Sequence, residues 1–485
     1  MIGRALFVAI VAVGLAACAA GGPSPSAAVP SGDASNAANG PDGSTPAGQG
    51  PSDPGAISRA FIEALAAGDT AAAEAMEDAT MRSAAPAAAL GQLWGQLVTQ
   101  FGAFGGLGNA EVKEQAPYMI ATVQARFADA TVPLIVTVTG DGLVAGLHLG
   151  QPEPVASGLP SSGSPAPSEA ASPAAYVNPE AFTETEVTVG AAPWALPGTL
   201  SMPTGNGPFP AVVLVAGSGP QDRDETIGPN KPLRDLAWGL ASNGIAVLRY
   251  EKRTKAYQAE MAARVAEITV REETIDDALA AIDLLRATPG VDRDRVFLAG
   301  HSLGGYLAPR IAAAAPGRLA GIALLEANAS PLQRLIEAQL AYLASDEGGS
   351  DPQATAMLEA LPAKVALVES PDLSPATPAS ALPLGIPAAY WLDLRGYDPT
   401  ATARDLSIPI FIAQGGWDYQ VPPGELLIWR EALGDHAEAT IREYRSLNHL
   451  LLAGSGSSRP AEYGVPGHVA TEVVEDLAAW MLRAP

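Results

Sequence analysis

The chain is poor in several residue types that carry chemistry. Its 485 residues include one cysteine, which excludes a disulfide bond within the chain and a metal site built from thiolates. Five histidines leave few candidates for a general base. The chain has 28 lysines and arginines against 52 aspartates and glutamates. The resulting net charge of -24 argues against nucleic-acid binding and against adhesion to anionic lipid through basic patches.

Motifs for metals and phosphates are missing as well. The sequence contains no His-Glu-x-x-His pattern, no cluster of cysteine and histidine, and no glycine-lysine pair of a phosphate-binding loop. We therefore expect neither a metal nor a cofactor.

The chain begins with a segment that has the pattern of an export signal. Residues 1–4 are a short basic start, and residues 5–17 are apolar but too short to span a bilayer comfortably. The segment closes with Leu-Ala-Ala-Cys at Cys18, which resembles the lipobox of bacterial lipoproteins. This resemblance implies that residues 1–18 are a lipoprotein signal peptide with its lipobox. It also implies that Cys18 carries a lipid anchor, which holds the exported protein at the outer side of a bacterial membrane. The alternative is an ordinary signal peptide with an incidental cysteine.

Composition divides the remainder into two linkers and two folded parts. Residues 19–54 and 151–177 are rich in Ala, Gly, Pro and Ser, which predicts a disordered tether and a flexible linker. Residues 55–150 show helical spacing first and strand alternation after, the pattern of a small α+β domain. Residues 178–485 alternate apolar strands with helices, which predicts an α/β fold with a mostly parallel, doubly wound sheet. Residues 328–404 are too long for a connection and predict a helical cap.

The small domain carries Ala-Phe-Ile-Glu-Ala-Leu-Ala-Ala-Gly-Asp at residues 60–69. Followed by strands, this stretch resembles the nuclear transport factor 2-like domain found ahead of some exported bacterial hydrolases. The resemblance implies a cone-like fold that can enclose a ligand. No clustered polar set marks a site, so the role of the domain stays open.

The most informative stretch is Gly-His-Ser-Leu-Gly at residues 300–304. It lies between an apolar run rich in β-formers and an Ala-rich helical pattern, so Ser302 stands at a sharp turn. A nucleophile elbow needs glycine two residues before and two after its serine, because side chains there would collide. Gly300 and Gly304 fill these positions, and no other serine has such a pair. An ordinary glycine-rich loop between strand and helix is the alternative.

Partners for this serine follow in the order that an α/β hydrolase requires. Asp418 follows the predicted strand at residues 408–413, and His449 follows the one at residues 439–444. We therefore predict a Ser302, Asp418 and His449 triad. His436 and His468 adjoin helices and are poorly placed as the base, and His301 is expected to point away from the serine.

An oxyanion hole needs two backbone N–H groups. One is expected from Leu303, directly after the nucleophile. The other is expected from the loop at residues 216–220, where Ser218 is favoured over Gly217.

Five motifs together resemble one group of α/β hydrolases: the bacterial esterases related to dienelactone hydrolase and the serine aminopeptidase-like hydrolases. They lie at residues 216–226, 247–253, 300–305, 415–421 and 448–449, and the resemblance runs from about residue 182 to 480. It implies cleavage of small carboxylic esters through an acyl-enzyme. Many relatives have His where Ala216 stands, and Glu251 replaces a commoner Asp.

Two other functions stay open beside the esterase. A catalytic triad alone does not determine whether the bond that is cleaved is an ester or an amide, so a peptidase or other acyl hydrolase is one alternative. A catalytically silent binding lipoprotein is another. The acyl group, the physiological substrate and the oligomeric state are not predicted.

Two further groups of residues invite a structural interpretation. The cluster Asp222 to Glu225 is expected to form salt bridges with Arg249 or Arg253 rather than to bind substrate. Tyr390 and Trp391 could line a pocket in the cap, but packing in the core is favoured for such aromatics.

Overall fold

The computed structural model describes residues 53–78, 81–82, 87–115, 118–128, 130–149, 153–154, 172–345, 347–454 and 458–484. The predicted signal segment, Cys18 and nearly all of the tether lie outside these residues. The chain divides into two compact units, with the boundary at residues 163 and 164. Within the described ranges, no helix has the length and apolar character needed to cross a membrane.

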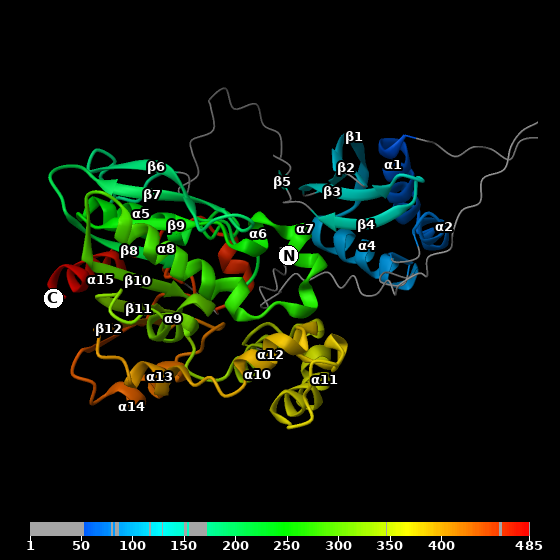
Figure 1. Ribbon diagram of the computed structural model, residues 1–485. Coiled ribbons are helices and arrows are strands. Elements are labelled where there is room, and N and C mark those ends of the chain that lie inside the picture. Colours follow the sequence, from blue (N-terminus) through cyan, green and yellow to red (C-terminus); the bar gives the residue numbers. More distant parts are fainter. Residues whose placement is uncertain are drawn as a thin grey trace, which may run out of the picture. The chain divides into compact units, whose positions relative to one another are not determined.

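The smaller unit has its helices first and an antiparallel sheet after, as predicted (Figure 1). Its helices are α1 (Pro54–Ala66), α2 (Thr70–Ala75) and α4 (Ala87–Phe101). Its sheet follows the order β1 (Phe104–Gln115), β2 (Tyr118–Phe127), β3 (Ala130–Thr139) and β4 (Val144–Leu149), with β5 (Glu153–Pro154) paired to β3. Strand β1 was not expected, because its glycines and charged residues hide the alternation of a strand.

Helix capping and burial in the smaller unit follow the sequence pattern with one exception. Asp69 accepts a hydrogen bond from the N–H of Ala72 at 3.0 Å and so caps α2. Trp94 and Leu97 of α4 are buried against Phe127 of the sheet. Val98 of the same helix is the exception, because this apolar side chain is exposed.

The larger unit is built on an eight-stranded sheet. Its strands are β6 (Phe182–Val189), β7 (Leu196–Pro203), β8 (Phe209–Val215), β9 (Ala246–Tyr250), β10 (Val291–His301), β11 (Gly321–Leu325), β12 (Ile410–Gly415) and β13 (Ala439–Tyr444). The spatial order is β13-β12-β11-β10-β8-β9-β7-β6. All pairs from β13 to β9 are parallel, whereas β6 and β7 pair antiparallel. The predicted mostly parallel sheet is therefore confirmed.

The strands alternate with helices, which is why their carboxyl ends share one edge of the sheet. The connecting helices are α5 (Pro232–Ser242), α6 (Arg253–Ala256), α7 (Gln258–Ala263), α8 (Asp276–Ala287), α9 (Leu303–Ala314), α14 (Gly424–Leu433) and α15 (Thr471–Arg483). A π-helical turn at Arg271–Ile275 directly precedes α8.

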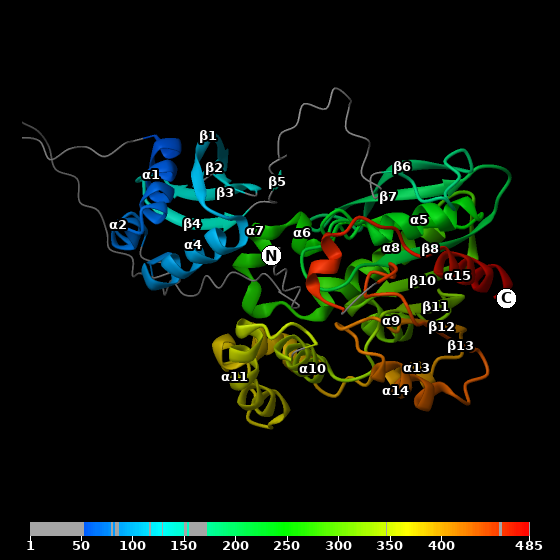
Figure 2. The same cartoon turned by 180° about the vertical axis from the view of Figure 1, so that it is seen from behind.

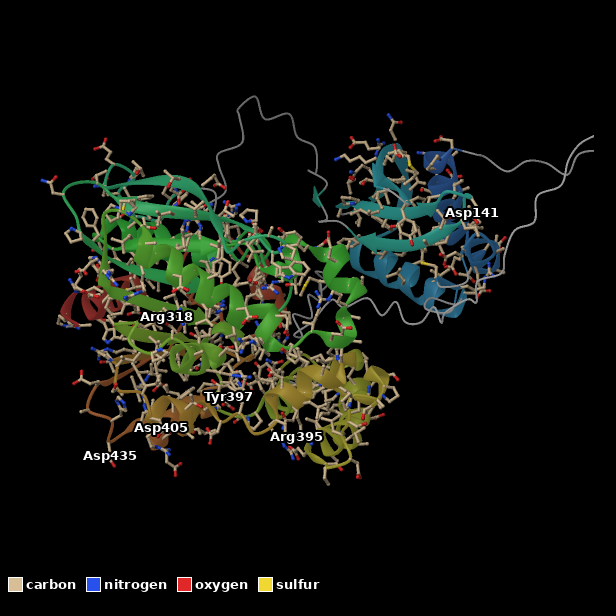
Figure 3. The ribbon with its side chains drawn as sticks, viewed as in Figure 1. Asp141, Arg318, Arg395, Tyr397, Asp405 and Asp435 are labelled. Carbon is tan, nitrogen blue, oxygen red and sulfur yellow. The ribbon has the colours of Figure 1, made fainter. Side chains whose placement is uncertain are left out.

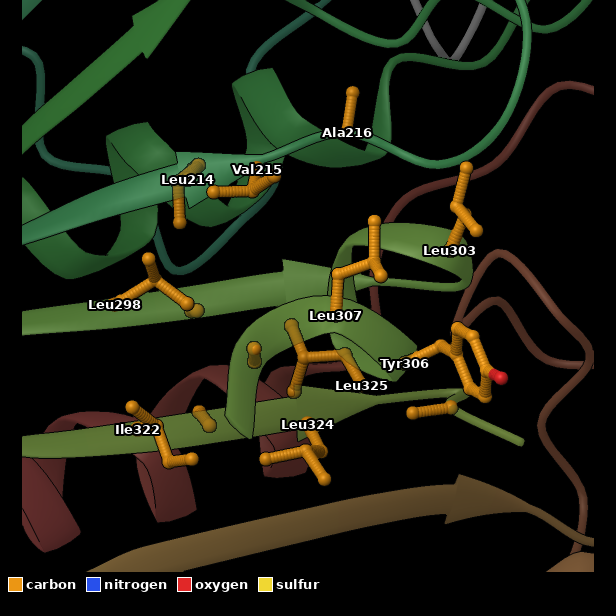
Figure 4. Close-up of a cluster of buried hydrophobic side chains, with 14 of the residues drawn as sticks. Leu214, Val215, Ala216, Leu298, Leu303, Tyr306, Leu307, Ile322, Leu324 and Leu325 are labelled. Atoms are coloured by element: carbon orange, nitrogen blue, oxygen red, sulfur yellow. The ribbon is translucent and has the colours of Figure 1, made fainter. Parts of the chain in front are cut away.

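Both faces of this sheet are covered by apolar side chains. On one face, Trp480 of α15 packs edge-on against Phe297 of β10, with ring centroids 5.4 Å apart. Side chains alternate along a strand, so the neighbouring Leu298 points to the opposite face. Figure 4 shows Leu298 with Leu307 of α9 and Leu325 of β11 in one buried cluster. This packing fixes β10 and α9, the elements on either side of Ser302.

Four α-helices lie between β11 and β12 in the described part of the segment for which a cap is predicted. They are α10 (Leu332–Ala344), α11 (Pro352–Glu369), α12 (Ala388–Leu394) and α13 (Pro399–Arg404). In Figures 1 and 2, α10 and α11 lie side by side. Tyr397, labelled in Figure 3, ties the segment to α9 by donating its hydroxyl to the carbonyl of Tyr306 at 2.8 Å.

Candidate active site

Ser302 lies at a strained turn between β10 and α9. Its backbone has φ 53° and ψ −118°, a conformation that a residue with a side chain rarely adopts. A Cβ atom on Gly300 would overlap the carbonyl oxygen of Gly304, and one on Gly304 would overlap that of Val215. The turn therefore requires glycine at both positions. The N–H of Ser302 donates to the Leu325 carbonyl at 2.9 Å, which ties the turn to the neighbouring strand.

Asp418 and His449 meet in the loops that follow β12 and β13. The Nδ1 of His449 donates to Oδ2 of Asp418 at 2.7 Å, and both side chains are buried. The other carboxylate oxygen of Asp418 accepts from the N–H groups of Gln420 at 2.7 Å and Val421 at 3.0 Å. The carboxylate is thus fixed by three donors and holds the imidazole in one orientation.

The imidazole of His449 lies beside the elbow. Its ring centroid is 4.8 Å from that of His301, the residue before Ser302, and Nε2 of His301 contacts the backbone oxygen of His449 at 2.7 Å. Within the described ranges, Ser302 and His449 share no side-chain hydrogen bond. Such bonds often tighten only when substrate binds, so the geometry is compatible with a serine and its base.

The two expected sources of the second oxyanion donor differ in availability. The N–H of Gly217 donates to Oε1 of Glu225 at 2.7 Å, so it is already engaged. No partner of the Ser218 N–H occurs in the part of the chain that the structure describes. Gly217 is therefore the less available donor, because its only N–H holds the loop together, and Ser218 stays the favoured prediction. Leu303 is the first residue of α9, where the N–H has no partner inside the helix.

His301 belongs to the architecture of this loop. Its Nδ1 forms an ion pair with Glu225 at 2.9 Å, and both residues are buried. Burial alone would lower the pKa of His301, but the Glu225 carboxylate outweighs it and the net pKa is raised. His301 consequently holds Glu225, and Glu225 holds Gly217 in the loop after β8, next to Ser302.

The acidic cluster forms ion pairs, though not all with the expected partners. Asp224 pairs with Arg249 at 2.9 Å, as expected. Arg253 pairs with Asp277 instead of with this cluster. Glu225 pairs with His301, so it belongs to the oxyanion loop and not to an arginine salt bridge.

A second buried chain of polar groups connects this loop to the cap. Lys252 donates through Nζ to the carbonyl of Gly217 at 2.7 Å and to Oε1 of Glu273 at 2.8 Å. Oε2 of Glu273 accepts from the hydroxyl of Tyr390 in α12 at 2.7 Å. Tyr390 and its neighbour Trp391 are buried in the core, as favoured from the sequence, yet Tyr390 also reaches the site through these bonds.

We expect Lys252→Met to lower the free energy of unfolding by about 3–5 kcal/mol, because it leaves the Glu273 carboxylate buried without its cation. Urea unfolding followed by circular dichroism measures the change. The double variant Lys252→Met with Glu273→Leu should be markedly more stable than Lys252→Met alone. Equal stability of the two variants would contradict a buried ion pair.

Two other histidines lie away from the site. His436 contacts the carbonyl of Leu406 at 3.0 Å, and His468 binds Asp235 at 2.9 Å. These contacts involve neither Ser302 nor Asp418, so the two histidines stay predicted as poor candidates for the base.

One buried acidic group near the site, Glu326, is not among the residues predicted from the sequence. Glu326 directly follows β11, and its carboxyl oxygen lies within 4.8 Å of the ligand atoms of Asp418 and His449. A metal ion could use such spacing, but both oxygens of each carboxylate already accept hydrogen bonds from the chain. Its place at the end of a buried parallel strand, like that of Asp418, is the signal that could have revealed it.

The sheet order, the strained elbow and the acid and histidine at later strand ends define a hydrolase of the α/β-hydrolase superfamily. Residues 231–454 match the family described as "Serine aminopeptidase, S33". Residues 58–147 match the family described as "Protein of unknown function (DUF3887)". The resemblance of this smaller unit to a nuclear transport factor 2-like domain stays a prediction.

Similarity to a named relative shows to which family within the α/β-hydrolase superfamily the chain belongs. The chain is 38% identical over 395 residues to Esterase EstD from Thermotoga maritima, covering 81% of this chain and 87% of that protein. The chain therefore belongs to the family of this esterase and is a serine-type hydrolase.

Solved structures of low similarity include two esterases and a peptidase. Est1E from Butyrivibrio proteoclasticus is 14% identical with a TM-score of 0.40, covering 61% of this chain and 98% of that one. The Pyrobaculum calidifontis esterase is 17% identical with a TM-score of 0.39, covering 62% and 87%. The acylaminoacyl peptidase of Pyrococcus horikoshii is 16% identical with a TM-score of 0.40, covering 78% and 56%. At these scores the likenesses carry no argument about function.

Proposed function

We propose that the protein is an exported, lipid-anchored hydrolase that cleaves carboxylic esters with Ser302, His449 and Asp418. The observation that carries the proposal is the buried 2.7 Å bond between Asp418 and His449, beside the strained turn of Ser302. A bond of this kind fixes the tautomer in which Nε2 of His449 is free to accept a proton.

The reaction follows from these positions. Oγ of Ser302 attacks the ester carbonyl while its proton passes to Nε2 of His449. The N–H groups of Leu303 and Ser218 bind the oxyanion of the tetrahedral intermediate. His449 then gives the proton to the leaving alcohol as the carbon–oxygen bond breaks. Water, deprotonated by His449, attacks the acyl-enzyme, and Ser302 recovers its proton as the acid leaves.

The leaving group separates esterase from peptidase, and the named relative supports the ester. We expect efficient hydrolysis of p-nitrophenyl acyl esters and little or no hydrolysis of aminoacyl p-nitroanilides. The esters release p-nitrophenol and the anilides release p-nitroaniline, and both products are coloured. A spectrophotometric assay therefore gives kcat/KM for each substrate class, and the two values can be compared. A preference for the anilides would overturn the ester assignment in favour of the family described as an aminopeptidase.

The lipid anchor is supported by the Leu-Ala-Ala-Cys sequence alone. We expect the full-length chain, produced in a bacterium, to partition into the detergent phase of Triton X-114. Cys18→Ala should move it to the aqueous phase, because lipidation needs the thiol. Unchanged partitioning would exclude this anchor.

A further inference from the structure

Glu326 occupies an unusual backbone position at the end of β11. Its φ is 50°, in the left-handed region that non-glycine residues avoid. Its N–H donates to the carbonyl of Ala413, which fixes it to strand β12. The side chain is fully buried. Oε1 accepts from the N–H of Gly415 at 2.7 Å, and Oε2 accepts from the side-chain amide of Gln414 at 2.7 Å.

The carboxyl groups of Glu326 and Asp418 form a close buried pair. The ligand oxygens of the two side chains lie within 4.8 Å of each other. In the part of the chain that the structure describes, no lysine or arginine pairs with either group. Two carboxylates cannot both ionise at such a distance in a buried site, so one of them keeps a proton.

The donors around the pair decide which group is charged. Asp418 accepts from two backbone N–H groups and from the imidazole of His449. Glu326 accepts one backbone N–H and one neutral side-chain amide. Burial, and next the charge of Asp418, raise the pKa of Glu326 well above its usual range. The proton therefore resides on Glu326, and the charge on Asp418.

We propose that Glu326 is a positioning residue whose neutral carboxyl donates a hydrogen bond to the Asp418 carboxylate and holds it against Nδ1 of His449. The inference rests on the proposed function, since it assigns a task within the same triad. Glu326 keeps its proton throughout the reaction and touches no reacting atom. Its fixed place between β11 and β12 gives the Asp418 loop a rigid support.

The test compares Glu326→Gln, which keeps a neutral donor, with Glu326→Leu, which removes it. We expect kcat of Glu326→Leu to fall about 10- to 100-fold with KM nearly unchanged, because a hydrogen bond to a charged group is lost. Glu326→Gln should retain kcat within about threefold of wild type. Glu431→Gln, an exposed substitution on α14, is the matched control. A loss in Glu326→Gln as large as that in Glu326→Leu would show that an ionised carboxylate is needed and would overturn the proposal.

A pH series separates positioning from mere packing. Asp418 and His449 face Glu326 from the loops after β12 and β13. The charge of Asp418 also acts on His301 and Glu462, whose pKa values it raises. A carboxyl whose pKa is raised by folding stabilises the folded chain below its unfolded pKa, about 4.3, and loses that contribution as pH rises through the folded pKa. Wild type should therefore lose stability relative to Glu326→Gln between about pH 5 and about pH 8.

Urea unfolding of the two proteins at both pH values measures this difference, and it needs no activity. A pH-independent difference between them would overturn the neutral carboxyl. If Glu326→Leu does not fold, the pH-dependent difference in stability between wild type and Glu326→Gln is sufficient to test the proposal. Should Ser302→Ala keep its activity, the proposed function fails, whereas the pH series still reports on Glu326.

Discussion

Ser302→Ala should lower kcat for p-nitrophenyl esters by about a million-fold, close to the residual rate that binding and the oxyanion hole provide without a nucleophile. The alanine lacks the hydroxyl that forms the acyl-enzyme, while its backbone can keep the strained turn. A fluorophosphonate probe measures the same loss directly, since it labels only an activated serine. Wild type should be labelled at Ser302, and the variant should not be labelled at all.

Ser407→Ala is a suitable control, because this serine is exposed and lies before β12, away from the elbow. It should retain both labelling and esterase activity. If folded wild type failed to react with the probe, the chain would be a silent hydrolase fold with a binding role.

Asp418→Asn should reduce kcat by about ten-thousandfold. The asparagine can still accept from the N–H groups of Gln420 and Val421, so the loop keeps its shape. Its amide, however, donates to Nδ1 of His449, which forces the proton onto Nε2 and blocks the base. Stopped assays with p-nitrophenyl esters across neutral pH measure the loss.

Asp405→Asn, on an exposed residue labelled in Figure 3, should leave kcat unchanged. Labelling of Asp418→Asn by the fluorophosphonate should slow in parallel with esterolysis. A variant that kept wild-type kcat would remove Asp418 from the triad and would point to Glu326 as the acid.

Much of the larger unit could be predicted because its buried strands are continuous apolar runs. Val212 to Val215 and Phe297 to Ala299 read as strands covered on both faces, and the structure has them at the centre of the sheet. The order of Ser302, Asp418 and His449 along the chain then placed all three at one edge. Parallel strands share that edge, so a local pattern sufficed to bring distant residues together.

The contacts that could not be predicted from the sequence are those between residues far apart in the chain, which the fold brings together. Sequence spacing shows that Glu326 ends a strand, but not that the adjacent strand brings Asp418 to it. Glu225 carries the same charge as Asp224, and only the fold reveals that one faces His301 and the other Arg249. Ser218 is favoured over Gly217 from the sequence, but only the fold reveals that the N–H of Gly217 is bound to Glu225.

The place of the cap in the chain has a consequence for the order of folding. Strand β10, helix α9 and strand β11 are consecutive, so the elbow can form from contacts between near neighbours in sequence. Strand β12 joins β11 only after the whole cap segment has looped out, and closing a long loop is slow and entropically unfavourable. A newly made chain would thus form the turn of Ser302 before the loops that carry Asp418 and His449, and the proposed triad would be complete only after the cap segment has been closed off.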